Sequence, residues 1–141
     1  MKKKTVIVLS LLAALLILGM GACLSNGGAD AHSSKEALDW DGVYTGTTPA
    51  ADAEGIAVRL RLNRDGTFEK SIQYLGKSSN VYNEAGTFKW NKAGDTVILD
   101  IKDAPPYYKV VEGALIQLDM KGKRITGEFA DMYVLKKLLA N

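Results

Sequence analysis

The sequence of 141 residues contains one cysteine, one histidine and three prolines, and it has no large excess of charge of either sign. Its 18 basic and 16 acidic side chains give a net charge of +2, but three of the lysines lie within residues 1–22, which contain no acidic residue. The rest of the chain therefore carries 15 basic and 16 acidic groups, a net charge of −1. Because a nearly neutral domain lacks the one-sided field that nucleic-acid binding requires, the sequence predicts no nucleic-acid partner.

The shortage of thiol and imidazole groups limits the chemistry that the chain can perform. A single cysteine leaves no internal disulfide and no pair of thiolate ligands, and the one histidine, His32, has no second ligand near it. The aspartate pairs Asp39 with Asp41 and Asp100 with Asp103 fall in turns or at strand ends, where aspartate is favoured for bonding to local backbone. The sequence therefore predicts no catalytic residue, no metal site and no cofactor, and indicates a protein that is not an enzyme.

Residues 1–22 have the parts of a secretory signal peptide: three lysines, a long apolar run and small residues at the end. An uncleaved membrane anchor is the alternative interpretation, because the run approaches the roughly 18 residues at which a helix can span a bilayer. The residues Met20-Gly21-Ala22-Cys23 resemble the lipobox of bacterial lipoproteins. This resemblance implies cleavage between Ala22 and Cys23 and attachment of lipid to Cys23, in place of a buried structural thiol.

Lipid attachment predicts the membrane as a partner, since several acyl chains at about 0.8 kcal/mol per buried methylene anchor a protein firmly. The residue after the cysteine is Leu24, and not the aspartate that resembles an inner-membrane retention signal, which favours the outer membrane. Residues 23–38 are rich in small and polar side chains without an apolar period, which is typical of a flexible tether. Residues 39–141 then form the folded domain.

From Trp40 onward, short runs of alternating apolar and polar residues predict β-strands. One face of a strand near residues 56–62 is apolar, with Ile56, Val58, Leu60 and Leu62. The turn Arg64-Asp65-Gly66 leads into residues 67–75, where Phe68, Ile72 and Tyr74 repeat the pattern, so these two runs are expected to form a hairpin.

Six further strands are expected at residues 43–47, 86–90, 96–101, 107–112, 114–119 and 132–137. Eight short strands with short connections favour an all-β fold, a small antiparallel up-and-down barrel. Such a barrel is either filled by side chains or wide enough for one small apolar ligand, and the sequence leaves both open. The aromatic residues that would form the core or line a ligand site are Trp40, Tyr44, Phe68, Tyr74, Phe88, Trp90, Tyr108 and Tyr133.

The order of motifs resembles the N-terminal domain of the NlpE family, known as copper resistance lipoproteins. The first half of the resemblance consists of Tyr44, Gly46, Pro49, Gly55, Ile56, Asp65, Gly66, Thr67, Phe68, Tyr74 and Leu75, and the second half of residues 86–88, 118–120, 122–123, 125–127 and 133–136. It implies a lipocalin-like barrel on an acylated tether. It also implies a role in envelope stress, passed to a two-component system through contact with an envelope sensor protein.

The sequence departs from the family at the loop where the family pattern has two cysteines, because this chain has Ala50 and Ala53 there. Without those thiols a copper site is not expected. In the same loop Asp52 and Glu54 offer far fewer than the roughly six to eight oxygens that calcium takes, and they are interpreted as solvated charges. The leading hypothesis is thus envelope stress sensing or homeostasis, the alternative is lipocalin-like binding of a small apolar ligand, and metal handling is third.

Overall fold

The computed structural model describes residues 33–139, which form eight β-strands, one short α-helix and one 3₁₀ helix. The strands are β1 (Gly42–Thr48), β2 (Gly55–Leu62), β3 (Thr67–Leu75), β4 (Val81–Trp90), β5 (Thr96–Leu99), β6 (Tyr107–Val111), β7 (Ala114–Gln117) and β8 (Val134–Lys137). The helices are α1 (Ser34–Ala37) and the 3₁₀ helix η1 (Ala130–Tyr133). None of the helices in this part of the chain is long and apolar enough to cross a membrane.

Each strand pairs antiparallel with the next along the chain, and β8 pairs with β1, so the sheet closes into a barrel. The predicted all-β, eight-stranded, up-and-down barrel is therefore confirmed. Closure rests on a short seam, because β1 and β8 are paired only at Tyr44 with Lys137 and at Thr45 with Lys136. Gly46 adjoins this seam, where an added Cβ would lie 2.8 Å from the Val134 carbonyl oxygen, so only glycine allows the two strands to approach this closely.

The predicted β2–β3 hairpin is present, with Leu62 opposite Phe68 at its closed end. Gly66 supplies the positive φ of 84° that the turn needs. The Asp65 carboxylate accepts hydrogen bonds from the backbone N–H and the hydroxyl of Thr67, at 3.0 and 2.6 Å. These contacts set the register from which the inner and outer faces of both strands follow.

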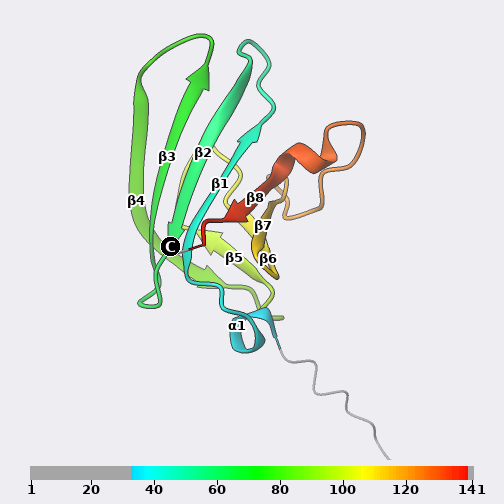
Figure 1. Cartoon of the computed structure of the whole chain (residues 1–141). Coiled ribbons are helices and arrows are strands. Elements are labelled where there is room, and N and C mark those ends of the chain that lie inside the picture. Colours follow the sequence, from blue (N-terminus) through cyan, green and yellow to red (C-terminus); the bar gives the residue numbers. More distant parts are fainter. Residues whose placement is uncertain (1–32, 140–141) are drawn as a thin grey trace, which may run out of the picture. The chain divides into compact units, whose positions relative to one another are not determined.

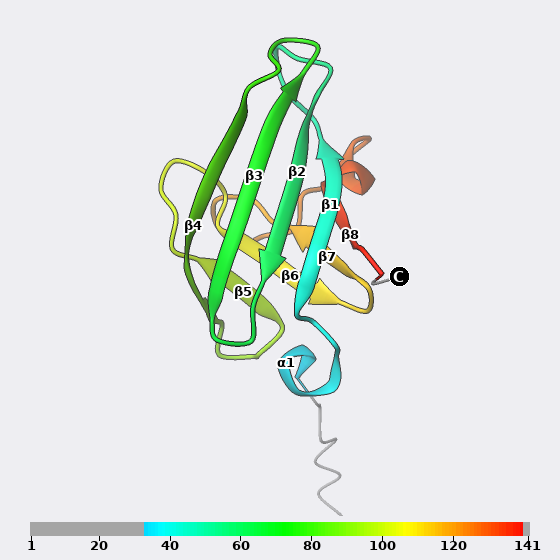
Figure 2. The same ribbon diagram turned by 60° about the vertical axis from the view of Figure 1, so that its left-hand side comes forward.

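The barrel has two unequal halves. Figures 1 and 2 show β1 to β4 as long strands that rise beyond the shorter strands β5 to β8, with α1 at the opposite end of the barrel. The strand β4 is the longest, with ten residues, and it pairs with β3 over residues 81–87 but with β5 only over residues 88–90. The first part of β4 therefore has a neighbour on one side only.

A compact core fills the half of the barrel near α1. Trp40 packs edge-on against Phe88 and Trp90, with ring centroids 5.9 and 5.4 Å apart. The other buried apolar residues of this core are Tyr44, Val58, Leu60, Leu62, Phe68, Val97, Leu99, Tyr108, Val110, Leu115 and Leu135. The sequence allowed either a packed interior or a ligand cavity. In this half of the barrel the interior is packed with side chains.

Residues 34–38, which the sequence pattern assigned to the tether, are part of the folded body. The Ser34 hydroxyl donates a hydrogen bond to the Val110 carbonyl oxygen at 3.0 Å, and the Lys35 N–H donates to the Gly94 carbonyl oxygen at 3.0 Å. The side chain of Leu38 packs against the core. Contacts with distant backbone hold this segment without requiring an apolar repeat in its sequence, and the boundary between tether and domain stays a prediction.

Several strand boundaries also differ from those expected. Strand β4 begins at Val81 and not at residue 86, and β5 and β7 end two residues before the predicted positions. The expected last strand at 132–137 is divided, since residues 130–133 form η1 and only Val134–Lys137 are extended.

Candidate functional site

The four loop positions singled out in the sequence lie between β1 and β2, at the end of the barrel away from α1. Ala50 and Ala53 are half-buried there, whereas Asp52 and Glu54 are exposed. The Asp52 carboxylate forms an ion pair with the Lys77 ammonium in the β3–β4 loop. This contact lowers the pKa of Asp52 and raises that of Lys77.

The backbone fastens the same two loops together. The N–H of Glu54 donates a hydrogen bond to the carbonyl oxygen of Leu75 at 3.1 Å, and the side chain of Glu54 lies against Gly76. Within residues 33–139, no group of three or more histidine, cysteine, aspartate or glutamate side chains is arranged to hold a metal ion. An ion pair and a backbone hydrogen bond therefore connect the β1–β2 loop to its neighbour.

The predicted lipid attachment and cleavage positions, Cys23 and Ala22, lie outside the described residues, as does His32. Their roles stay predictions.

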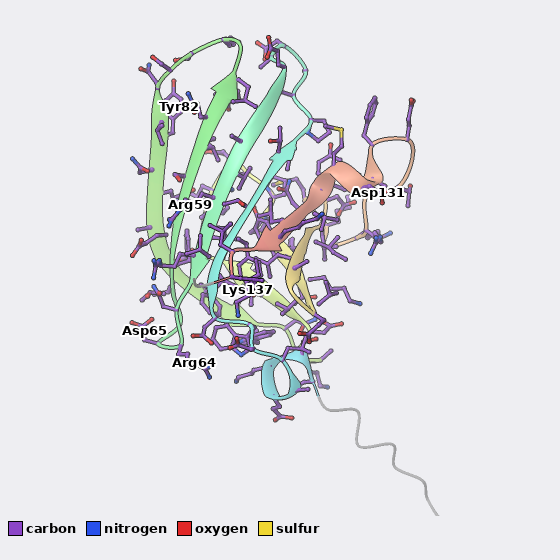
Figure 3. All side chains as sticks on the ribbon, in the orientation of Figure 1. Arg59, Arg64, Asp65, Tyr82, Asp131 and Lys137 are labelled. Atoms are coloured by element: carbon purple, nitrogen blue, oxygen red, sulfur yellow. The ribbon has the colours of Figure 1, made fainter. Side chains whose placement is uncertain are left out.

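The pair Asp39 and Asp41 is held by cations at the other end of the barrel. The Arg64 guanidinium lies 2.6 Å from the Asp41 carboxylate and 3.3 Å from that of Asp39, and the Lys137 ammonium lies 2.9 Å from Asp39. The contact with Lys137 lowers the pKa of Asp39. Figure 3 shows Arg64 in the β2–β3 turn, at the same end of the barrel as α1. A carboxyl group whose pKa is lowered in this way is unsuited to act as a general acid near neutral pH.

A second group of polar residues lies on the inner face of the barrel, above the packed core. Lys70 occupies the position between Phe68 and Ile72 on β3, so its side chain shares their inward face. Its ammonium lies 5.9 Å from the ring centroid of Tyr108 on β6. Burial lowers the pKa of Lys70, and the nearby Glu84 carboxylate opposes that effect.

The hydroxyl of Tyr108 is fully buried and has no hydrogen-bond partner among the described residues. Burial raises the pKa of Tyr108, and the Glu84 carboxylate raises it further. A buried polar group without a partner is unusual in a folded protein, so this hydroxyl marks the region around Lys70 as a candidate binding site.

An aromatic pair lies above Lys70 on the same inner face. Tyr74 of β3 and Tyr82 of β4 contact each other edge-on, with ring centroids 6.0 Å apart. Tyr82 is 53% exposed, since no strand covers the first part of β4. Figure 3 shows Tyr82 near the end of β4 remote from Arg64. The predicted aromatic set is thus divided between a packed core and an accessible inner face.

Sequence reasoning missed Lys70, Tyr82 and Glu84 as members of one site. The signal for Lys70 was available, because the even-numbered residues of β3 are those that face inward. Tyr82 and Glu84 join it through the pairing of Ile72 with Tyr82 and of Lys70 with Glu84. That pairing could not be predicted, because residues 81–85 were not recognised as strand.

Comparison with known proteins identifies the family. The profile of the NlpE N-terminal domain matches residues 44–128, which is more than half of the chain and extends from β1 to the connection before η1. The chain belongs to the NlpE N-terminal domain family. The resemblance noted in the sequence is therefore confirmed, and η1 and β8 of this NlpE-type barrel lie outside the matched range.

Two relatives of this NlpE-family chain, one of them matched both by its sequence and by its crystal structure, extend the comparison. The lipoprotein NlpE of Escherichia coli is 34% identical over 87 residues, which cover 61% of the chain and 37% of that protein. A crystal structure of a Shewanella oneidensis protein described as a lipoprotein has a TM-score of 0.69 and 42% identity, and the match covers 74% of this chain and 94% of that one. The crystal structure of the Cpx pathway activator NlpE from E. coli has a TM-score of 0.53 and 30% identity, covering 63% and 46% of the two chains.

The present chain therefore spans less than half the length of the E. coli NlpE chains that it matches.

Proposed function

We propose that this NlpE-family protein is a lipid-anchored protein of the cell envelope that acts in envelope stress signalling through protein contacts, without catalysis. The observation that carries this proposal is its similarity to E. coli NlpE, a Cpx pathway activator, over 61–63% of the chain. The partner would be the sensor protein of such a pathway.

The side chains of the barrel support a role without catalysis. The Asp39 and Asp41 carboxylates, a candidate acid–base pair in the sequence, are neutralised by Arg64 and Lys137. Asp103 lies in the turn after β5 with a positive φ of 59°, a backbone conformation that aspartate tolerates in turns. These contacts fit a structural role for the aspartates.

The anchor is an essential part of the proposal. We infer cleavage between Ala22 and Cys23, lipid on Cys23 and transport to the outer membrane, because Leu24 follows the cysteine. A change of membrane would then change which proteins the barrel meets. A protein held at the inner membrane would lie beside the sensor.

The experiment is a Cpx-type reporter strain that produces the full chain at matched levels as wild type, Leu24→Asp and Leu24→Ser. We expect overproduced wild type to raise the reporter. Leu24→Asp should raise it further, because the aspartate favours inner-membrane retention, whereas Leu24→Ser serves as the matched control and should behave as wild type. The proposal would be contradicted if none of the three strains raised reporter activity above that of a strain without the protein, while each protein was present in its expected membrane.

A second candidate function, binding of a small apolar ligand, is supported by the accessible inner face of β3 and β4, where Tyr82 is 53% exposed. Copper handling has little support. Between residues 33 and 139 the only sulfur donors are Met120 and Met132, and no cluster of other metal-binding side chains accompanies them.

A further inference from the structure

We propose that the inner face formed by Lys70, Ile72, Tyr82 and Tyr108 binds a small amphipathic molecule with a singly charged acidic headgroup, and that Lys70 and the Tyr108 hydroxyl hold this headgroup. This inference rests on the second candidate function given above, and it is independent of the signalling role.

The register of β3 and β4 places Lys70, Ile72 and Tyr82 together with Glu84. Lys70 is opposite Glu84, and Ile72 is opposite Tyr82, so all four side chains of these pairs point to the inside of the barrel. Below them, Phe68 belongs to the packed core, and above them Tyr74 contacts Tyr82. The side chain of Lys70 thus lies between the packed core at Phe68 and the accessible pair of Tyr74 and Tyr82.

Two side chains of this face, Tyr108 and Lys70, carry hydrogen-bond donors for which the described residues supply no acceptor. The Tyr108 hydroxyl is buried and unpartnered within the described part of the chain. The Lys70 ammonium, 5.9 Å from the same ring, forms no hydrogen bond or ion pair in residues 33–139. The penalty for an unpaired buried donor falls on the Tyr108 hydroxyl, because the Lys70 side chain is only half-buried. A carboxylate or phosphate oxygen is the acceptor that satisfies both donors.

Glu84 limits the charge of the ligand. Its carboxylate faces the same interior and is exposed, and it acts on both Lys70 and Tyr108 through its charge. With one cation and one anion at the site, a headgroup with a single negative charge meets less repulsion than one with two. The site therefore favours a carboxylate over a doubly charged phosphate.

The apolar surface above Lys70 determines the length of the apolar part of the ligand. Ile72, Tyr74 and Tyr82 provide apolar surface along β3 and β4, and two of these three are large aromatic rings. The four residue steps of extended strand from Lys70 to Tyr74 span about 13 Å. A medium-chain fatty acid has this scale, and its chain would cover the exposed ring of Tyr82 while its carboxylate reaches Lys70.

The test is isothermal titration of the mature chain, residues 23–141 carrying Cys23→Ser to prevent acylation, with decanoate, decyl phosphate and decanol. We expect decanoate to bind more tightly than decanol. Lys70→Met should weaken decanoate binding about tenfold or more, since hydrogen bonds to charged groups contribute about 1.5–3 kcal/mol, and it should leave decanol binding unchanged. Lys89→Met, which removes an exposed lysine from the outer face of β4, is the matched control and should bind decanoate as wild type does.

A second variant separates ligand contact from folding. Tyr108→Phe removes only the unpartnered hydroxyl, so it should remain folded and yet bind decanoate several times more weakly. Tighter binding of decyl phosphate than of decanoate would overturn the preference for a carboxylate. The proposal fails if wild type binds no decanoate at millimolar concentration, if Lys70→Met and Tyr108→Phe both bind it as wild type does, or if Lys89→Met loses as much affinity as Lys70→Met.

Discussion

The ammonium of Lys137 lies 2.6 Å from the backbone carbonyl oxygen of Asp39 and 2.9 Å from its carboxylate. This contact joins the end of the last strand to the segment just before the first one. It therefore reinforces the seam at which β1 and β8 are paired through only two residue pairs. The N–H of Leu138 adds a hydrogen bond to the Val43 carbonyl oxygen at 2.7 Å on the same seam.

We predict a pH-dependent contribution of the Asp39 carboxylate to stability. The pKa of Asp39 is lowered in the folded state by Lys137, so its contribution is present above the unfolded pKa of about 3.9 and is lost as the pH falls through the lower folded value. Asp39→Asn should lower Tm by a few degrees at pH 7 and have no effect at the acidic limit. Thermal unfolding followed by circular dichroism at several pH values measures this.

Lys137→Met provides the comparison for that experiment. It removes the hydrogen bond to the carbonyl oxygen of Asp39 as well as the ion pair, so its effect on Tm should be larger than that of Asp39→Asn and should persist in acid. Equal Tm values for wild type and both variants at pH 7 would show that the seam does not depend on this contact.

We predict opposite effects of removing the hydroxyl from two buried tyrosines. The hydroxyl of Tyr44 donates to the carbonyl oxygen of Trp40 at 2.5 Å, and burial together with nearby carboxylates raises the pKa of Tyr44 to about 12. Tyr44→Phe should lower the free energy of unfolding by about 1 kcal/mol. Tyr108→Phe should leave it unchanged or raise it by up to about 1 kcal/mol, since that hydroxyl has no partner within residues 33–139. Urea denaturation of both variants measures these changes. Equal losses in the free energy of unfolding would contradict the conclusion that only the Tyr44 hydroxyl has a hydrogen-bond partner.

We predict that α1 contributes to the stability of the barrel. A chain that begins at Asp39 lacks the hydrogen bonds of Ser34 and Lys35 and the packing of Leu38 that a chain beginning at Ser33 retains. The shorter chain should be less stable by about 2 kcal/mol or more, as measured by urea denaturation with tryptophan fluorescence. Coincident unfolding curves would mean that the tether extends to residue 38 after all.

We predict that thiols restored at the β1–β2 loop will create a copper site. Ala50→Cys with Ala53→Cys adds two soft ligands three positions apart to a chain whose described residues contain no cysteine. A competition titration with a copper(I) indicator should show about one ion bound to the double variant and none bound with micromolar affinity to wild type. The double serine variant at the same positions is the control. Copper binding by wild type would contradict the prediction, because the ion would then be held by ligands other than the two loop thiols.

The parts of the fold that the sequence predicts correctly are those with an apolar repeat or a turn signal. The β2–β3 hairpin follows from the alternation at residues 56–62 and from Asp65-Gly66. The first half of β4 does not, because residues 81–85 are all exposed and so carry no alternation. The packing of α1 against the barrel could not be predicted either, because the hydrogen bonds of Ser34 and Lys35 to distant backbone do not depend on an apolar repeat.

The candidate site was predictable only in part. The alternation of side chains along β3 places Lys70 on the inner face. The sequence does not show that Tyr108 of β6 lies beside Lys70, and the candidate site depends on that contact. The unpaired state of the Tyr108 hydroxyl is a property of the assembled core and leaves no trace in the local sequence. In contrast, the loss of the family's loop cysteines at Ala50 and Ala53 is visible in the sequence alone.

The one-sided pairing of β4 also affects how this protein behaves in a crowded solution. Residues 81–86 present a row of backbone donors and acceptors on the side away from β3, and such a row is a template on which strands of other molecules can add. Glu84 places a charge on the inner side of this exposed strand, a feature that discourages edge-to-edge association. The residue proposed to limit the charge of a ligand thus also supplies the charge expected to oppose association along this edge.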